Sequence, residues 1–121
     1  MISYVTIGTN DLERAATFYD AVLAPLGCKR GPETERYKSW VGPTRGPMLM
    51  VMKPFDEKPA TVGNGVMIAL GAESPAVVDA VYKAAIDAGG ACAGEPGERR
   101  PGLYVGYFRD LDGNKLDAIC M

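Results

Sequence analysis

The chain has 121 residues, 15 acidic and 13 basic side chains and no histidine, which gives a formal net charge of −2. This length suffices for one domain with its own core, and the slightly acidic balance argues against nucleic-acid binding, which favours a basic face. No stretch approaches the roughly 20 apolar residues of a membrane span. The first residues show no signal-peptide pattern, and three scattered cysteines are typical of buried thiols in a reducing compartment. We therefore expect a cytoplasmic protein.

The first half of the chain predicts a strand, a helix and three more strands. Apolar residues within 2–7 form a short strand that ends at Gly8. Asn10 and Glu13 have the spacing of a capping box, and apolar residues then recur at helical spacing as far as Leu26. Gly27 is typical of a helix end. Three short extended segments follow, at 28–30, 36–41 and 48–53.

The second half repeats this order after a linker. Residues 54–63 contain two prolines, a glycine and three charges, which is typical of a connecting segment. A strand at 66–70 precedes Ser74, a predicted helix N-cap, and Pro75 at the first helical position; this helix extends to about residue 88. Strands at 91–94, 103–109 and 115–120 complete the unit, and Asp112-Gly113 predicts a hairpin between the last two.

A shift of 63 residues aligns the two halves. It places residues 10–12 on residues 73–75, at the start of each helix, and it places Tyr4 on Met67. A self-match of this size indicates one supersecondary unit used twice, so matched residues are expected to face each other across a pseudo-two-fold axis. We predict a single domain over residues 1–121, with unit one at 1–53, the linker at 54–63 and unit two at 64–121.

Two stretches of the chain resemble a known family. Residues 4–20 contain the pattern Asp-Leu-x-x-Ala-x-x-Phe-Tyr after a strand, and residues 107–117 contain Phe-x-Asp-x-Asp-Gly-Asn in the closing hairpin. With both motifs, the chain resembles the vicinal oxygen chelate superfamily, which includes glyoxalase I, the bleomycin resistance proteins and the extradiol dioxygenases. The resemblance implies an α+β fold in which two tandem βαβββ units form an open, curled mixed β-sheet around a cleft.

The resemblance also implies where a metal site would lie. Metal-dependent members take ligands, usually His, Gln or Glu, from the first and last strands of each unit. A shift of 67 residues matches Trp40 with Tyr107 and Met50 with Asp117, so the corresponding four residues here are Tyr4, Met50, Met67 and Asp117. Only Asp117 is a plausible ligand for a hard metal ion. We therefore predict neither a metal ion nor another cofactor, and we disfavour glyoxalase I or dioxygenase activity.

The four matched residues have alternative roles. Asp117 could be a general base whose pKa is raised by apolar neighbours, or a strand residue held by a hydrogen bond from an opposing side chain. Tyr4 could donate a proton or a hydrogen bond to a ligand, or it could pack with its hydroxyl satisfied. Met50 and Met67 are expected to form an adaptable apolar wall of the cleft.

Further residues are candidates for ligand binding. The aromatic side chains of Trp40, Tyr104 and Tyr107 could stack on a flat ligand, although strand aromatics are more often part of a core. Arg99 and Arg100 precede a strand at the expected rim of the cleft. They could bind an anionic ligand, or they could be ordinary solvated charges.

Two functions from different classes remain. The first is a metal-free binding protein that holds an aromatic or amphipathic small molecule in its central cleft, as in the bleomycin resistance branch. The second is an enzyme: a lyase or isomerase that uses Asp117 and Tyr4, or a metal enzyme with unusual ligands. Apolar walls with few polar groups favour the first. The resemblance further implies a homodimer, in which units could be exchanged between chains, and we expect no nucleic-acid or membrane partner.

Overall fold

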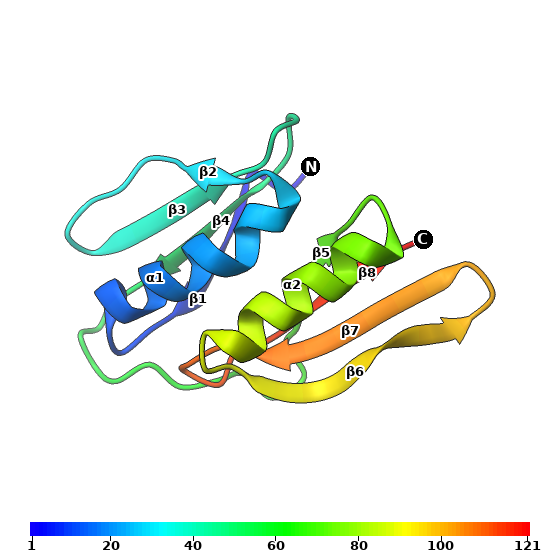
Figure 1. The fold of residues 1–121 in the computed structure, drawn as a ribbon. Helices are drawn as coiled ribbons and strands as arrows, with labels where there is room; N and C mark the ends of the chain where they lie inside the picture. Colours follow the sequence, from blue (N-terminus) through cyan, green and yellow to red (C-terminus); the bar gives the residue numbers. More distant parts are fainter.

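The computed structural model describes all residues 1–121 and contains two βαβββ units in tandem (Figure 1). The first unit forms a mixed sheet of order β1-β4-β3-β2, in which β1 runs parallel to β4 and the other neighbours are antiparallel. Its elements are β1 (Tyr4–Gly8), α1 (Leu12–Leu23), the 3-10 turn η1 (Ala24–Leu26), β2 (Lys29–Arg30), β3 (Tyr37–Val41) and β4 (Met48–Met52).

The second unit forms a sheet of the same design. Its order is β5-β8-β7-β6, with β5 parallel to β8. Its elements are β5 (Ile68–Gly71), α2 (Pro75–Asp87), β6 (Ala91–Arg100), β7 (Leu103–Arg109) and β8 (Lys115–Cys120). The two helices and two open four-stranded mixed sheets confirm the predicted α+β fold with a repeated unit. Neither helix is long and apolar enough to cross a membrane.

The start of α1 differs from the predicted capping box. The N-cap is Asp11, whose carboxylate accepts a hydrogen bond of 3.1 Å from the Arg14 amide. Asn10 instead holds the linker, because its side-chain oxygen accepts from the Ala60 amide at 2.7 Å and its side-chain nitrogen donates to the Ala60 carbonyl at 3.2 Å. The predicted cap of α2 is confirmed, since the Ser74 hydroxyl accepts from the Val77 amide.

The strand predicted at 91–94 is much longer in the structure. β6 continues to Arg100, so Arg99 and Arg100 lie in a strand and not in a rim loop. Its pairing with β7 shifts register between Cys92 and Gly94 and again before Gly97. Such bulges let an irregular, glycine-containing segment continue along a regular neighbour, which sequence periodicity does not reveal.

One core joins the two units. The helices α1 and α2 lie side by side and cover the same side of the molecule, with both sheets behind them (Figure 1). Sixteen buried residues form one cluster that includes Phe18 and Tyr19 of α1, Val81 of α2 and Phe108 of β7. The units therefore share their helix-side core, and each sheet keeps its other face outside it.

The hairpin loop at 110–114 fastens the second unit to the first. Asp112 accepts hydrogen bonds from the Thr9 hydroxyl, the Asn10 amide at 2.9 Å and the Arg14 guanidinium at 3.3 Å. Asp110 is buried and accepts from the Tyr19 hydroxyl at 2.6 Å. The acidic residues of the closing motif therefore hold the fold together and are engaged by protein groups.

Candidate functional site

The first sheet has an open face that is rich in methionine. Leu49 and Val51 of β4 point into the core, so the alternating positions point away from the helices. Strand register places Tyr4 beside Met48 and Thr6 beside Met50. We call Tyr4, Thr6, Met48, Met50 and Met52 the methionine face. Tyr4 is 54% exposed, and flexible thioethers provide an adaptable apolar surface.

The second sheet has an open face of different character. Phe108 and Leu116 belong to the core, so the alternating residues of β7 and β8 point away from the helices. In register, Tyr107 lies beside Asp117 and Arg109 lies beside Lys115. The Lys115 ammonium lies 5.4 Å from the centre of the Tyr107 ring, and the Arg99 guanidinium carbon lies 5.7 Å from it. We call Arg99, Tyr107, Arg109, Lys115 and Asp117 the charged face.

Glycines on β6 make room for the arginine over the tyrosine ring. A methyl group at Gly97 would come within 2.9 Å of Arg99 Nη1, and one at Gly94 would come within 2.9 Å of Tyr107 Cδ2. The Arg99 guanidinium also donates to the Glu95 carbonyl at 2.6 Å. Arg99 is therefore held over Tyr107. Both Arg99 and Arg100 are exposed, and Arg100 is the last residue of the strand.

Asp117 has the most unusual surroundings of the candidate residues. The residue is 2% exposed, and its buried Oδ1 has no hydrogen-bond partner. Burial raises the pKa of the Asp117 carboxyl above its usual range, and the nearby Lys115 ammonium offsets part of this shift. An unpartnered buried carboxylate oxygen is costly to the fold, because the chain supplies no donor in place of the water that the oxygen has lost.

The four matched residues do not meet within one chain. Tyr4 and Met50 stand on the methionine face, Asp117 stands on the charged face, and Met67 lies just before β5 with 41% of its surface exposed. No strand of one sheet pairs with a strand of the other. The expected convergence on a single cavity is therefore absent from the isolated chain, because the helices pack side by side and leave both open faces outside the shared core.

The alignment of the last two strands requires one correction. Ser39 pairs with Met50, whereas Tyr107 pairs with Asp117, so the position that corresponds to Tyr107 is Ser39 and not Trp40. The hairpin of the first unit is one residue longer than that of the second, and a slip of one residue turns a strand side chain to the opposite face.

Trp40 and Tyr104 both lie on the helix side. Trp40 is 3% exposed, packs against Tyr19 with ring centres 5.6 Å apart, and donates from Nε1 to Asp20 at 2.9 Å. The Tyr104 hydroxyl donates to Asp79 of α2 at 2.7 Å. Of the three aromatic candidates, only Tyr107 stands on an open face. Sequence reasoning missed Arg109 and Lys115, which strict alternation from Tyr107 and Asp117 would have identified.

The donor set does not fit a divalent metal ion. No three His, Cys, Asp or Glu side chains lie close enough together to hold one. The matched positions offer one carboxylate, one phenol and two thioethers, and they are divided between two faces. Hard and borderline metal ions require several oxygen or nitrogen ligands at one point, and these residues do not supply them.

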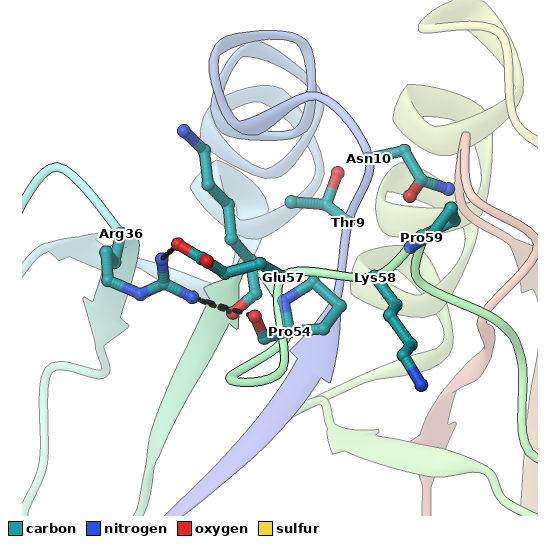
Figure 2. Close-up of a pocket in the computed structure, with 8 residues that line it drawn as sticks. Thr9, Asn10, Arg36, Pro54, Glu57, Lys58 and Pro59 are labelled. Atoms are coloured by element: carbon teal, nitrogen blue, oxygen red, sulfur yellow. Dashed lines mark hydrogen bonds and ion pairs between the residues drawn. The ribbon is translucent and has the colours of Figure 1, made fainter.

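A polar cavity of about 370 Å³ lies elsewhere, between the loop before α1, the residue before β3, the residue after β4 and the linker. Figure 2 shows the Arg36 guanidinium reaching toward Pro54 and Glu57 across this cavity. It donates to the Pro54 carbonyl at 2.7 Å and lies 3.8 Å from the Glu57 carboxylate. Because the Arg36 guanidinium is already bound to the linker, we interpret this cavity as the place where the linker packs against the first unit.

Comparison with known families identifies the chain. The model of the Glyoxalase/Bleomycin resistance protein/Dioxygenase superfamily matches residues 1–118. The protein therefore belongs to this superfamily. A comparison with curated protein sequences found no match.

Solved structures agree with this assignment. A glyoxalase/bleomycin resistance protein from Albidiferax ferrireducens T118 is 39% identical, with a TM-score of 0.90, over 98% of this chain and 97% of that one. A hypothetical protein, SA1046, from S. aureus is 25% identical, with a TM-score of 0.74, over 100% and 97% of the two chains. A lactoylglutathione lyase from Agrobacterium tumefaciens is 20% identical, with a TM-score of 0.71, over 98% and 92%, and shares the fold.

Proposed function

We propose that this protein binds an aromatic or amphipathic small molecule, without a metal ion, between a methionine face and a charged face. The observation that carries this proposal is the buried, unpartnered Oδ1 of Asp117, a residue that pairs across the strands with the half-buried Tyr107. A ligand with a hydrogen-bond donor would satisfy that oxygen, and a flat or apolar body would cover methionines that otherwise face water. Apolar walls with a few oriented polar groups are typical of small-molecule sites.

The proposed cleft needs a second copy of the chain. Each chain has one methionine face and one charged face, and its own packing does not bring them together. A two-fold dimer can place the methionine face of each copy over the charged face of the other, which forms two equivalent clefts. Tyr4 of one copy would then approach Asp117 of the second copy.

The binding proposal is tested by a thermal-shift screen of small aromatic and amphipathic compounds. A compound at a hundred times its Kd stabilises the folded protein by about 2.7 kcal/mol, which is a readily measured shift. We expect Asp117→Ala to remove most of the stabilisation by any hit. Glu35→Ala is the matched control, because Glu35 is an exposed acid outside both faces. Equal shifts in both variants would place the ligand elsewhere.

A lyase or isomerase is the second candidate function, favoured by the raised pKa of the Asp117 carboxyl. A carboxylate that holds protons more strongly is a better general base. In an isomerisation it would accept a proton from one substrate carbon, while Tyr4 of a second copy would donate its hydroxyl proton to the oxygen that develops negative charge. Transfer of the Asp117 proton to a neighbouring carbon, with return of the oxygen-bound proton to Tyr4, then restores both groups. For an enzyme, we expect the turnover rate to rise with pH as the Asp117 carboxyl loses its proton, and we expect Asp117→Asn to abolish turnover. Both results would support catalysis as the function, and not ligand binding alone.

A further inference from the structure

Two basic residues stand directly opposite each other at the end of the charged face. Arg109 is the last residue of β7 and Lys115 is the first of β8, and the two are paired in register. Both point away from the helices, since Phe108 and Leu116 next to them point into the core. Like charges in directly opposed cross-strand positions repel each other and destabilise a sheet.

No acidic side chain of this chain forms an ion pair with either residue, although the Asp117 carboxylate is near enough to interact with the Lys115 charge. The ion pairs of the molecule include neither residue, so Asp117, the nearest acid along β8, remains beyond ion-pair distance. Arg109 Nη1 donates to the Gly113 carbonyl at 2.9 Å, which fixes the guanidinium and leaves other N–H groups free. The Lys115 ammonium rests near the Tyr107 ring and makes no hydrogen bond to protein.

The two cations line a cavity of suitable size. It measures about 480 Å³, and its remaining walls are residues 62–67, which run from the end of the linker to the residue before β5. Small-molecule sites commonly have volumes of about 300–1,000 Å³. The cavity thus combines a double positive charge with an apolar wall of one methionine and two valines, and Tyr107 lies next to it on the same face.

We propose that this cavity is an anion subsite, in which Arg109 and Lys115 bind the carboxylate or phosphate group of the ligand. An arginine fork fixes the orientation of such a group, a lysine adds a mobile point charge, and a bound anion would cancel the cross-strand repulsion. The apolar body of the ligand would extend over Met67 and Tyr107 toward Asp117. This inference rests on the proposed binding function and names the chemical class of one end of its ligand.

The test uses three probes on the full-length protein at constant ionic strength: inorganic phosphate, phenyl phosphate and benzyl alcohol. Amide chemical shifts in a ¹H–¹⁵N NMR titration report where each probe binds. We expect phosphate and phenyl phosphate to shift the amides of 62–67 and 109–115. Phenyl phosphate should bind more tightly, because its ring adds apolar contact. Equal affinity for both anions would identify free phosphate as the ligand and still support the subsite.

Variants determine whether the two cations are responsible. Lys115→Gln should weaken phenyl phosphate about tenfold, equivalent to about 1.4 kcal/mol, and leave benzyl alcohol unchanged. Lys29→Gln is the matched control, because Lys29 is an exposed lysine in a strand of the other sheet and forms no ion pair. Arg109→Lys should retain more phenyl phosphate affinity than Arg109→Gln. Lys115→Gln also removes the repulsion, so the fold should withstand the change.

The results separate this inference from the function on which it rests. If the anions shift no amides in these segments up to about 10 mM, or if Lys115→Gln binds phenyl phosphate as the parent does, the anion subsite is wrong. If benzyl alcohol still shifts the amides of Met67 and Tyr107 in that case, the proposed small-molecule site is supported without the anion subsite. A third result is that phenyl phosphate binds tightly, that Lys115→Gln weakens this binding and that Asp117→Ala does not. It would support the anion subsite and refute the role of Asp117 in ligand binding.

Discussion

Among single residues, Asp117 stands out because its buried carboxylate oxygen has no hydrogen-bond partner. The residue lies beside Tyr107 on the side of the sheet that faces away from the helices. Burial makes the charged form unfavourable in the folded state, so this residue links folding to pH.

Asp117→Asn should therefore stabilise the protein at neutral pH. The folded carboxyl has the higher pKa, so between the unfolded and folded pKa values the folded state binds more protons, and stability falls as pH rises through that window. The neutral amide does not titrate, so its advantage should be on the order of 1 kcal/mol at pH 7 and vanish below about pH 3. Urea unfolding at several pH values measures this. A gain that persists unchanged at low pH would show that the carboxyl charge is not its cause.

At the scale of elements, the β7–β8 hairpin loop joins the units. Asp112 alone receives three hydrogen bonds from the first unit, one of them from the Arg14 guanidinium. Its own side chain is 4% exposed, so the carboxylate is shielded from water. The motif that identifies the family in this loop is thus explained by assembly of the two units.

Asp112→Ala should cost about 2–3 kcal/mol of unfolding free energy, because it leaves buried donors without an acceptor. Chemical denaturation measures the loss. Asp56→Ala is a control of the same type, since Asp56 is an exposed acid in the linker. A loss no larger than the control's would mean that the hairpin contributes little to holding the units together.

The start of α1 gives a second prediction at this scale. Asp11→Ala should cost about 1 kcal/mol, as expected for the loss of an N-cap. Asn10→Ala should act differently, because it releases the linker at Ala60 and leaves the helix cap in place. Hydrogen exchange separates the two: faster exchange in the first turn of α1 is expected only for Asp11→Ala.

At the scale of the whole molecule, both sheets expose one face that the core leaves uncovered. Large apolar side chains gather at the edges of these faces, with Tyr4, Val66 and Met67 all more than 40% exposed. Exposed apolar surface of this kind is typical of an interface or a binding groove. A second copy is the occupant that the two dissimilar faces and the internal repeat favour.

Met50→Glu should therefore convert the proposed dimer to monomers. The residue lies at the centre of the methionine face and outside the core, so a charge there should disrupt association and leave the fold intact. Sedimentation should give about twice the chain mass of 12.9 kDa for the parent and the chain mass for the variant. Ala80→Glu, on the exposed side of α2, is the control. A monomeric parent at micromolar concentration would contradict the dimer.

Sequence patterns alone determined the order of elements, the repeat and the family. Apolar periodicity, helix caps and turn residues are local properties, so α1, α2 and most strands agree with prediction to within a few residues. The exceptions are the N-cap, where a tertiary contact with Ala60 takes Asn10, and β6, where bulges extend the strand past Gly94.

The tertiary structure decided which residues form the site. Strand alternation predicts which side chains share a face, but the direction of that face depends on the register of the strands. The β3–β4 hairpin is one residue longer than the β7–β8 hairpin, so Trp40 points into the core while Tyr107 points away from it. The packing of α1 beside α2 separated Tyr4 and Met50 from Asp117. Local sequence patterns were sufficient to identify the repeated unit. The arrangement of the two units within the chain depends on packing between residues far apart in the sequence, so only the tertiary structure determined it.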